Sequence, residues 1–170
     1  MPDLTLADVD HIAAEAHAGQ VDKIGAPYIE HPRAVAAGLA PFGVGMQMAG
    51  LLHDVLEDTP VTAADLRNAS VPESVISTVE RVTKKPRWDY EAMVEHAAEE
   101  YASCLLKIAD NSHNSHPDRT AQLPLDKRER LAAKYAQARS ILWPAVPRED
   151  VAAILRIVNP SLLGELENLR

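Results

Sequence analysis

The sequence is poor in cysteine, and it contains no long hydrophobic run. Cys104 is the only cysteine among 170 residues, so no disulfide can form within the chain. Proteins without disulfides are typical of reducing compartments, which favours the cytoplasm as the location. No stretch approaches the roughly 20 apolar residues of a membrane-spanning helix, and residues 1–10 lack the apolar segment of a secretory signal. We therefore expect a cytoplasmic protein with no membrane partner.

A basic surface is also missing, because the formal net charge of the chain is −8 at pH 7. Proteins that bind long nucleic acids normally present an excess of positive charge to the phosphate backbone. The composition therefore predicts no long nucleic-acid partner. It remains compatible with a small phosphorylated substrate, since a bound cation can supply positive charge locally.

Signals for β-strands are weak, because aromatic residues make up only 4% of the chain and β-branched runs are short. Helical periodicity dominates instead, and prolines interrupt it. We predict helices over residues 5–18, 32–41, 45–58, 62–69, 72–83, 89–100, 104–113, 126–142, 149–158 and 161–168. A loop is predicted between Pro117 and Pro124. The sequence thus predicts a single all-α domain over residues 1–170, which the helices of residues 126–170 complete.

The run His53-Asp54-Val55-Leu56-Glu57-Asp58 carries the strongest chemical signal. On one continuous helix, His53 would share a face with Glu57, and Asp54 would share a face with Asp58. Three carboxylates this close repel one another unless something holds them together. A divalent cation does so, because it binds imidazole nitrogen and carboxylate oxygen together. The run therefore predicts a metal site, and a solvated acidic helix end is the weaker alternative.

Two further side chains can complete such a site. His31 lies where a helix is predicted to begin, on a segment stiffened by prolines. Asp110 ends an apolar stretch, and a carboxylate there is costly to bury unless it is paired or bound to metal. Together with His53 and Asp54 they form a set of two histidines and two carboxylates. This mixture of nitrogen and oxygen ligands suits Mn²⁺ or Fe²⁺, and Zn²⁺ is an alternative.

The order of these residues, together with several flanking stretches, resembles the HD-domain phosphohydrolases, and more closely the (p)ppGpp hydrolases of the RelA/SpoT type and the small alarmone hydrolases. The matching stretches lie within about residues 16–114 and read AHAGQ (16–20), PYIEHP (27–32), LLHDVLEDT (51–59), VTK (82–84) and KIAD (107–110) with Asn114.

This resemblance implies an α-helical fold with one Mn²⁺ held by His31, His53, Asp54 and Asp110. It implies that Glu57 and Asp58 activate the hydrolytic water, and that the reaction removes the 3′-pyrophosphate of guanosine tetra- or pentaphosphate.

Substrate contacts are predicted at three further positions. Lys107 and Asn114 lie about one helical turn before and after Asp110, and could contact phosphate and ribose. Lys23 is a third candidate. A lysine lying along a buried helix and a polar helix cap are the simpler interpretations of Lys107 and Asn114.

Two positions depart from the family pattern. Asp22 stands where the family has the arginine of an Arg-Lys pair near the guanine, and Asn111 stands where an arginine usually follows the metal-binding aspartate. Both changes remove positive charge. They favour an alternative in which the same centre acts on another phosphorylated metabolite, such as a nucleoside monophosphate or NADPH. A non-catalytic alarmone-binding protein is a further alternative, and Met46 and Met48 beside an apolar helix could support a homo-oligomer.

Overall fold

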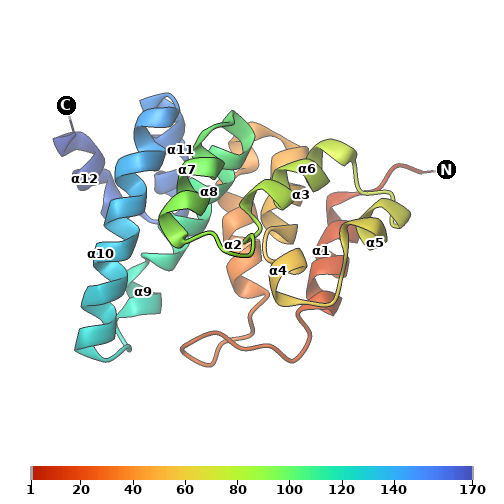
Figure 1. Ribbon diagram of the computed structural model, residues 1–170, viewed down its shortest axis with the longest axis horizontal. Coiled ribbons are helices and arrows are strands. Elements are labelled where there is room, and N and C mark those ends of the chain that lie inside the picture. The colour runs from red at the N-terminus through yellow and green to blue at the C-terminus, as the bar shows by residue number, and fades with distance from the viewer. Residues whose placement is uncertain (1, 170) are drawn as a thin grey trace.

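The computed structural model describes residues 2–169 and consists of helices joined by short connections (Figure 1). The α-helices are α1 (Leu6–Ala16), α2 (Glu30–Gly38), α3 (Val44–Leu52), α4 (Val55–Asp58), α5 (Ala63–Asn68), α6 (Glu73–Val82), α7 (Tyr90–Ala98), α8 (Tyr101–Asn114), α9 (Pro117–Thr120), α10 (Leu125–Leu142), α11 (Arg148–Val158) and α12 (Leu163–Asn168). The only β-type pairing within this range is an isolated bridge between Val21 and Pro27. The predicted all-α class is confirmed.

Local sequence signals explain where several helices begin. Thr5 at the start of α1 and Thr62 at the start of α5 both form complete capping boxes, with Asp8 and Asp65 respectively. In each box, the threonine hydroxyl accepts from a backbone N–H of the first turn, while the aspartate accepts from the backbone N–H of the threonine. The helices predicted from residues 5 and 62 therefore begin next to the threonines of these capping boxes.

Two predicted boundaries are wrong. The helix expected to run through the acidic residues is divided, because α3 ends at Leu52 and α4 begins at Val55. Asp54 adopts φ −103° and ψ −2°, and this turn separates the two helices. The loop predicted between Pro117 and Pro124 also contains α9, whose first residue is Pro117, a favourable position for proline.

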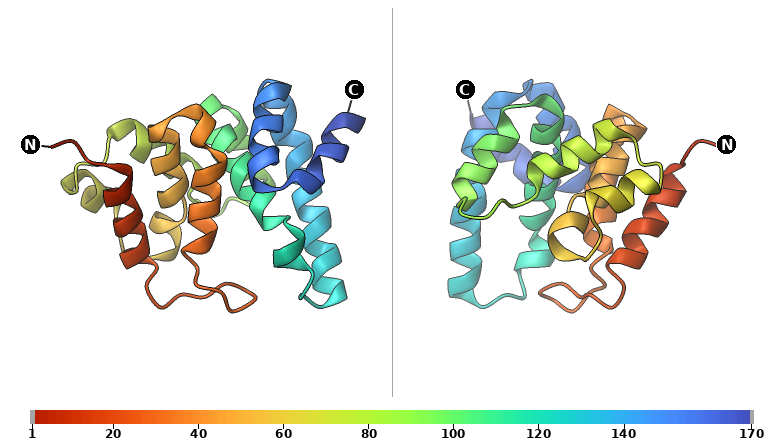
Figure 2. Two further views of the ribbon diagram at one scale, coloured as in Figure 1. Left: turned by 180° about the vertical axis from the view of Figure 1, so that it is seen from behind. Right: turned by 45° about the vertical axis from the view of Figure 1, so that its right-hand side comes forward.

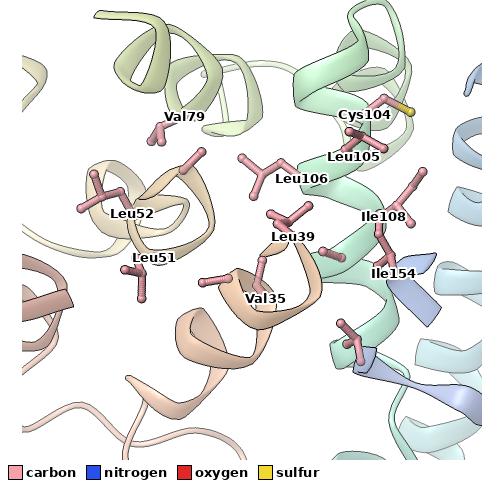
Figure 3. Close-up of a cluster of buried hydrophobic side chains, with 14 of the residues drawn as sticks. Val35, Leu39, Leu51, Leu52, Val79, Cys104, Leu105, Leu106, Ile108 and Ile154 are labelled. Atoms are coloured by element: carbon pink, nitrogen blue, oxygen red, sulfur yellow. The ribbon is translucent and has the colours of Figure 1, made fainter. Parts of the chain in front are cut away.

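Helix α8 forms the centre of the core, where Leu105, Leu106 and Ile108 are fully or almost fully buried. Figure 3 shows Leu106 extending from α8 toward α3. The helix packs against α2, α3, α6, α7, α10 and α11. Because α8 also carries Asp110, one turn before its C-terminal end, the same packing that buries the core fixes this carboxylate in place.

Helices α2 and α3 approach each other closely at Gly50. A Cβ atom added there would lie 2.8 Å from the Cα atom of Ala36, which is closer than side chains normally come to backbone. Only glycine therefore permits this separation, which sets the distance between His31 on α2 and His53 at the end of α3.

The remaining features are a long loop and the C-terminal helices. The loop of residues 17–29 joins α1 to α2 and extends toward α9, as both views in Figure 2 show. Helix α11 packs against α8 and α2, so the C-terminal helices share the core with the rest of the chain. None of the helices within residues 2–169 has the length and apolar character required to cross a membrane.

Candidate metal centre

The four predicted ligands lie together, although they come from distant parts of the chain. We refer to His31, His53, Asp54 and Asp110 as the metal-centre cluster. His31 Nε2 lies 3.2 Å from His53 Nε2 and 3.0 Å from Asp110 Oδ1. Asp54 Oδ2 lies 3.0 Å from His53 Nε2 and 3.7 Å from His31 Nε2. Ligand atoms of His31, His53 and Asp54 thus lie within 4.8 Å of one another, and Asp110 Oδ1 lies 3.0 Å and 3.5 Å from the Nε2 atoms of the two histidines.

These separations fit a shared cation. Ligands that each lie about 2.1 Å from an ion are separated from one another by roughly 3.0–3.5 Å, depending on the coordination geometry. The observed distances of 3.0–3.7 Å fall close to this range. Two carboxylates also match the charge of a divalent ion. The donor atoms can therefore hold a divalent metal.

Both imidazoles are oriented by contacts on the side away from the centre. His53 Nδ1 lies 2.7 Å from the carbonyl oxygen of Gly50, so this nitrogen must carry the proton and donate it. His31 Nδ1 lies 2.7 Å from Nδ1 of His113. Burial, followed by the nearby His31, lowers the pKa of His113 to about 3. His113 is therefore neutral and can accept the proton of His31 Nδ1, which leaves Nε2 of His31 free for an ion. Burial lowers the pKa of His53, but Asp54 and Asp110 raise it well above its usual range, so an ion at His53 Nε2 would displace a proton.

The carboxylates of the cluster are held ionised. Burial alone would raise the pKa of Asp54, but His53 beside it brings this pKa to about 2. Burial also opposes ionisation of Asp110, whereas Lys107 and the two histidines hold its pKa well below the usual range. Negative charge is therefore present at the centre across the neutral pH range, as a cation site requires.

Each carboxylate has further hydrogen-bond donors. The Tyr28 hydroxyl donates to Asp54 Oδ2 at 2.6 Å. Lys107 Nζ donates to Asp110 Oδ2 at 2.9 Å, and Asn114 Nδ2 donates to Asp110 Oδ1 at 2.9 Å. Lys107 and Asn114, which were predicted as substrate contacts, thus lie against a metal-centre carboxylate and position it.

Glu57 and Asp58 follow directly on α4. Ligand atoms of Asp54, Glu57 and Asp58 lie within 4.8 Å of one another. Glu57 Oε1 accepts the backbone N–H of Lys84 at 2.7 Å. Glu57 also lines a small cavity of about 30 Å³ together with His53, Asp54 and Asp110, whereas Asp58 does not. Burial, and then Asp54 and Glu57, raise the pKa of Asp58.

Two larger cavities flank the metal-centre cluster. The loop cavity, of about 280 Å³, is lined by Asp22, Lys23, Tyr28, Asn114, Arg119 and Tyr135, among others. The lysine cavity, of about 320 Å³, is lined by Glu57, Lys84, Trp88, Tyr90, Lys107 and Lys134, among others. Tyr28 and Asn114 of the loop cavity and Lys107 of the lysine cavity donate to carboxylates of the cluster, so both cavities border the centre.

The two positions that depart from the family pattern have structural roles. Asn111 is 2% exposed, and its Nδ2 donates to the carbonyl oxygen of Tyr135, so it joins α8 to α10 away from the cluster. The Asp22 carboxylate lies 3.4 Å from the guanidinium of Arg119. An arginine is therefore present beside Asp22, on α9 instead of on the loop.

Sequence reasoning missed three residues near the cluster. Tyr28, His17 and His113 lie near the cluster but are not among the site residues that the sequence predicted. His113 lies three residues after Asp110 on α8, and this spacing is the one signal that could have identified it. His17 is 2% exposed and lies against the Tyr28 ring at a centroid distance of 4.9 Å.

Comparison with known proteins agrees with this geometry. A family model described as an HD domain matches residues 11–146. The bifunctional (p)ppGpp synthase/hydrolase SpoT of Escherichia coli is 36% identical over 144 residues, which cover 77% of this chain and 20% of that protein. A guanosine-3′,5′-bis(diphosphate) 3′-pyrophosphohydrolase of Haemophilus influenzae is 40% identical over 134 residues, covering 71% of this chain and 19% of that protein. The chain thus spans about a fifth of the length of these relatives.

A solved structure extends the comparison to the fold. It belongs to a metazoan ortholog of SpoT that is described as hydrolysing ppGpp, and it superposes with a TM-score of 0.73. The match covers 92% of this chain and 96% of that chain at 23% sequence identity. The arrangement of helices is therefore shared over nearly the whole chain. With the matched family model and the relatives at 36–40% identity, this chain belongs to the HD-domain family and resembles its (p)ppGpp hydrolase branch.

Proposed function

We propose that the protein is a metal-dependent hydrolase that removes the 3′-pyrophosphate from guanosine tetra- or pentaphosphate. The observation that carries this proposal is the metal-centre cluster, with Glu57 on the wall of the adjoining small cavity. The names of the relatives support the same substrate class. We further propose Mn²⁺ as the ion, because two imidazoles and two carboxylates suit it, with Fe²⁺ and Zn²⁺ as alternatives.

When bound, the cation would polarise a phosphoryl oxygen and lower the pKa of the attacking water. Glu57 is the better placed of the two acidic residues to take the proton of this water. The small cavity has about 30 Å³, which is enough for one water molecule. The hydrogen bond from the backbone of Lys84 holds the Glu57 carboxylate in position. Asp58 supports this role through its charge without lining the small cavity.

The surroundings of the cluster suit a highly anionic substrate. Within residues 2–169, Lys107 pairs with Asp110, whereas no acidic side chain lies within ion-pair distance of Lys84 or Lys134. Lys134 Nζ lies 4.1 Å from the centre of the Tyr90 ring, which places its charge at the lysine cavity. These two lysines can bind phosphate oxygens. The loop cavity on the other side then receives the nucleoside.

In the proposed reaction, water attacks the phosphorus attached to the ribose O3′ atom. The bond between this phosphorus and O3′ breaks, Glu57 takes a proton from the water, and the ribose oxygen gains a proton. The products are pyrophosphate and GDP, or GTP from the pentaphosphate. Proton transfer to a positioned carboxylate typically contributes about 10²–10⁴-fold to the rate.

Product analysis tests the proposal. Purified Mn²⁺-loaded protein is incubated with ppGpp, NADPH and a set of nucleoside mono- and triphosphates, and we expect pyrophosphate and GDP from ppGpp. Glu57→Gln should retain the metal and lose about 10²-fold or more in kcat. Glu91→Gln, which changes an exposed glutamate of α7, is the control and should behave as the unchanged protein. Phosphate release from another compound, with ppGpp untouched, would replace the proposed substrate.

A further inference from the structure

The loop cavity contains an ion pair that is unusually well enclosed. The side chains of Asp22 and Arg119 are 6% and 18% exposed, and they join the loop of residues 17–29 to α9. Both residues line the cavity. Tyr28 and Asn114, which line the same cavity, donate to Asp54 and Asp110 of the metal-centre cluster. A nucleoside in this cavity would therefore lie next to the place where its phosphates react.

Both oxygens of the Asp22 carboxylate contact other groups of the protein. Its Oδ1 atom accepts the backbone N–H groups of Ile24 and Ala26, each at 2.9 Å. Its Oδ2 atom faces the guanidinium of Arg119 at 3.4 Å. Oδ1 therefore holds two backbone N–H groups of the loop, and Oδ2 faces Arg119, in a side chain that is almost fully enclosed. Its role is to shape the loop and to hold Arg119.

Arg119, in contrast, can interact with a ligand. A guanidinium has five N–H donors and a flat face that stacks on aromatic rings. The contact with Asp22 engages one end of the group, and the side chain lines the cavity. Lys23 lies on the same wall, and its pKa is lowered by burial and then by the surrounding cations, which include Arg119. This wall therefore presents concentrated positive charge although the chain as a whole is acidic.

We propose that Arg119, held in place by Asp22, is the residue of this chain that binds the nucleobase in the loop cavity. The guanidinium is supplied by α9, whereas the loop of residues 17–29 supplies the carboxylate of Asp22. This inference rests on the proposed function for the nature of the ligand. Arg119 of α9 would then select for the base of the ligand, whereas a purely structural ion pair with Asp22 would only join α9 to the loop.

The test compares variants of Arg119 by binding and by turnover. Arg119→Met keeps the apolar stem and removes the guanidinium. We expect about a 10-fold weaker affinity for a fluorescent GDP analogue and a similar rise in KM for ppGpp, with kcat changed less than about 2-fold. The inhibition constant of inorganic pyrophosphate, which has no base, should stay unchanged. Arg128→Met is the matched control, because Arg128 donates to the nearby carbonyl of Ala121 and is not among the residues that line the cavity.

Two further variants keep the test decisive. Arg119→Lys retains the ion pair with Asp22 and loses the flat guanidinium, so it should still weaken GDP binding by about 3-fold or more even if Arg119→Met does not fold. Asp22→Asn retains the acceptor for the loop N–H groups and should weaken GDP binding less than Arg119→Met does.

The outcomes separate this inference from the proposed function. Hydrolysis of ppGpp with GDP binding unaffected by Arg119→Met and Arg119→Lys would overturn the role of Arg119 and leave the proposed function standing. Equal weakening of pyrophosphate and GDP, or failure of the unchanged protein to bind GDP, would also overturn it. Base-dependent loss of GDP binding without any hydrolysis of ppGpp would support Arg119 and remove the proposed reaction.

Discussion

The substitution Gly50→Ala should disturb both the fold and the metal-centre cluster, because Gly50 sets the separation of α2 and α3. The added Cβ would lie 2.8 Å from Ala36 Cα and 2.9 Å from Ala36 N. An ordinary contact begins near 3.4 Å, so the helices must separate by about 0.6 Å. Overpacking of this kind costs about 1–3 kcal/mol, and the gain in helix propensity offsets about 1 kcal/mol. A backbone contact cannot relax easily, so we expect a net loss of about 2 kcal/mol.

The same separation would move His31 away from His53. Their Nε2 atoms are 3.2 Å apart, and metal–ligand distances tolerate changes of only about 0.2 Å. We therefore expect the affinity for Mn²⁺ to fall about 10-fold or more. Thermal unfolding should show a decrease in Tm of roughly 4–8 °C in the presence of a chelator. Titration of the folded variant with Mn²⁺ then measures the loss of metal affinity.

Gly45→Ala is the control on the same helix. No atom lies within 4 Å of the position that its Cβ would occupy. This variant should be as stable as the unchanged protein or more stable, by up to about 1 kcal/mol, with unaltered metal affinity. If the two alanine variants had equal stability and equal affinity for Mn²⁺, the close approach of α2 and α3 would not control the centre, and the reasoning would fail.

Three other predictions follow from single contacts. His113→Phe keeps an aromatic ring beside His31 but removes the acceptor, so metal titration should show an affinity about 10–100-fold lower, and an unchanged affinity would contradict this orienting role. Burial raises the pKa of Cys104 to about 12, so a thiol reagent at pH 8 should react with the folded protein far more slowly than with the unfolded chain; equal rates would contradict it. The hydrogen bond from Arg33 lowers the pKa of Asp10, so its contribution to stability is present above the unfolded pKa of about 3.9 and is lost as the pH falls through the lower folded value. Asp10→Asn should therefore cost up to about 1 kcal/mol at pH 7 and almost nothing near pH 2, as measured by denaturant unfolding at both pH values.

The sequence predicted those parts of the structure that depend on local patterns. Capping residues such as Thr5 and Thr62 determine helix starts through contacts three residues away, and these can be recognised in one dimension. The proximity of His31, His53, Asp54 and Asp110 was also expected, because each lies in a short stretch that resembles the HD-domain phosphohydrolases. Their role as metal ligands stays a prediction until an ion is titrated.

Other features could not be predicted, because tertiary contacts decide them. Apolar periodicity favours one helix through His53, but the bond from its Nδ1 to Gly50 and the turn at Asp54 divide it. Helix α9 has four residues, which is too short to produce a periodic signal. The contacts of His31 with His113, and of Asp22 with Arg119, span 82 and 97 residues, and no spacing rule indicates such pairs.

The hydrogen bond from the Tyr28 hydroxyl to Asp54 couples the loop cavity to the metal-centre cluster. Tyr28 belongs to the loop of residues 17–29 and lines the loop cavity, while its hydroxyl bonds to Asp54 of the metal-centre cluster. A ligand that fixes this loop also fixes Asp54, and an ion at Asp54 fixes the loop in return. Such coupling is reciprocal, so each occupant strengthens the binding of the other by the same factor. If the protein has the proposed function, a shortage of the metal would weaken nucleotide binding as well as stop turnover, and the nucleotide would stay free for other proteins.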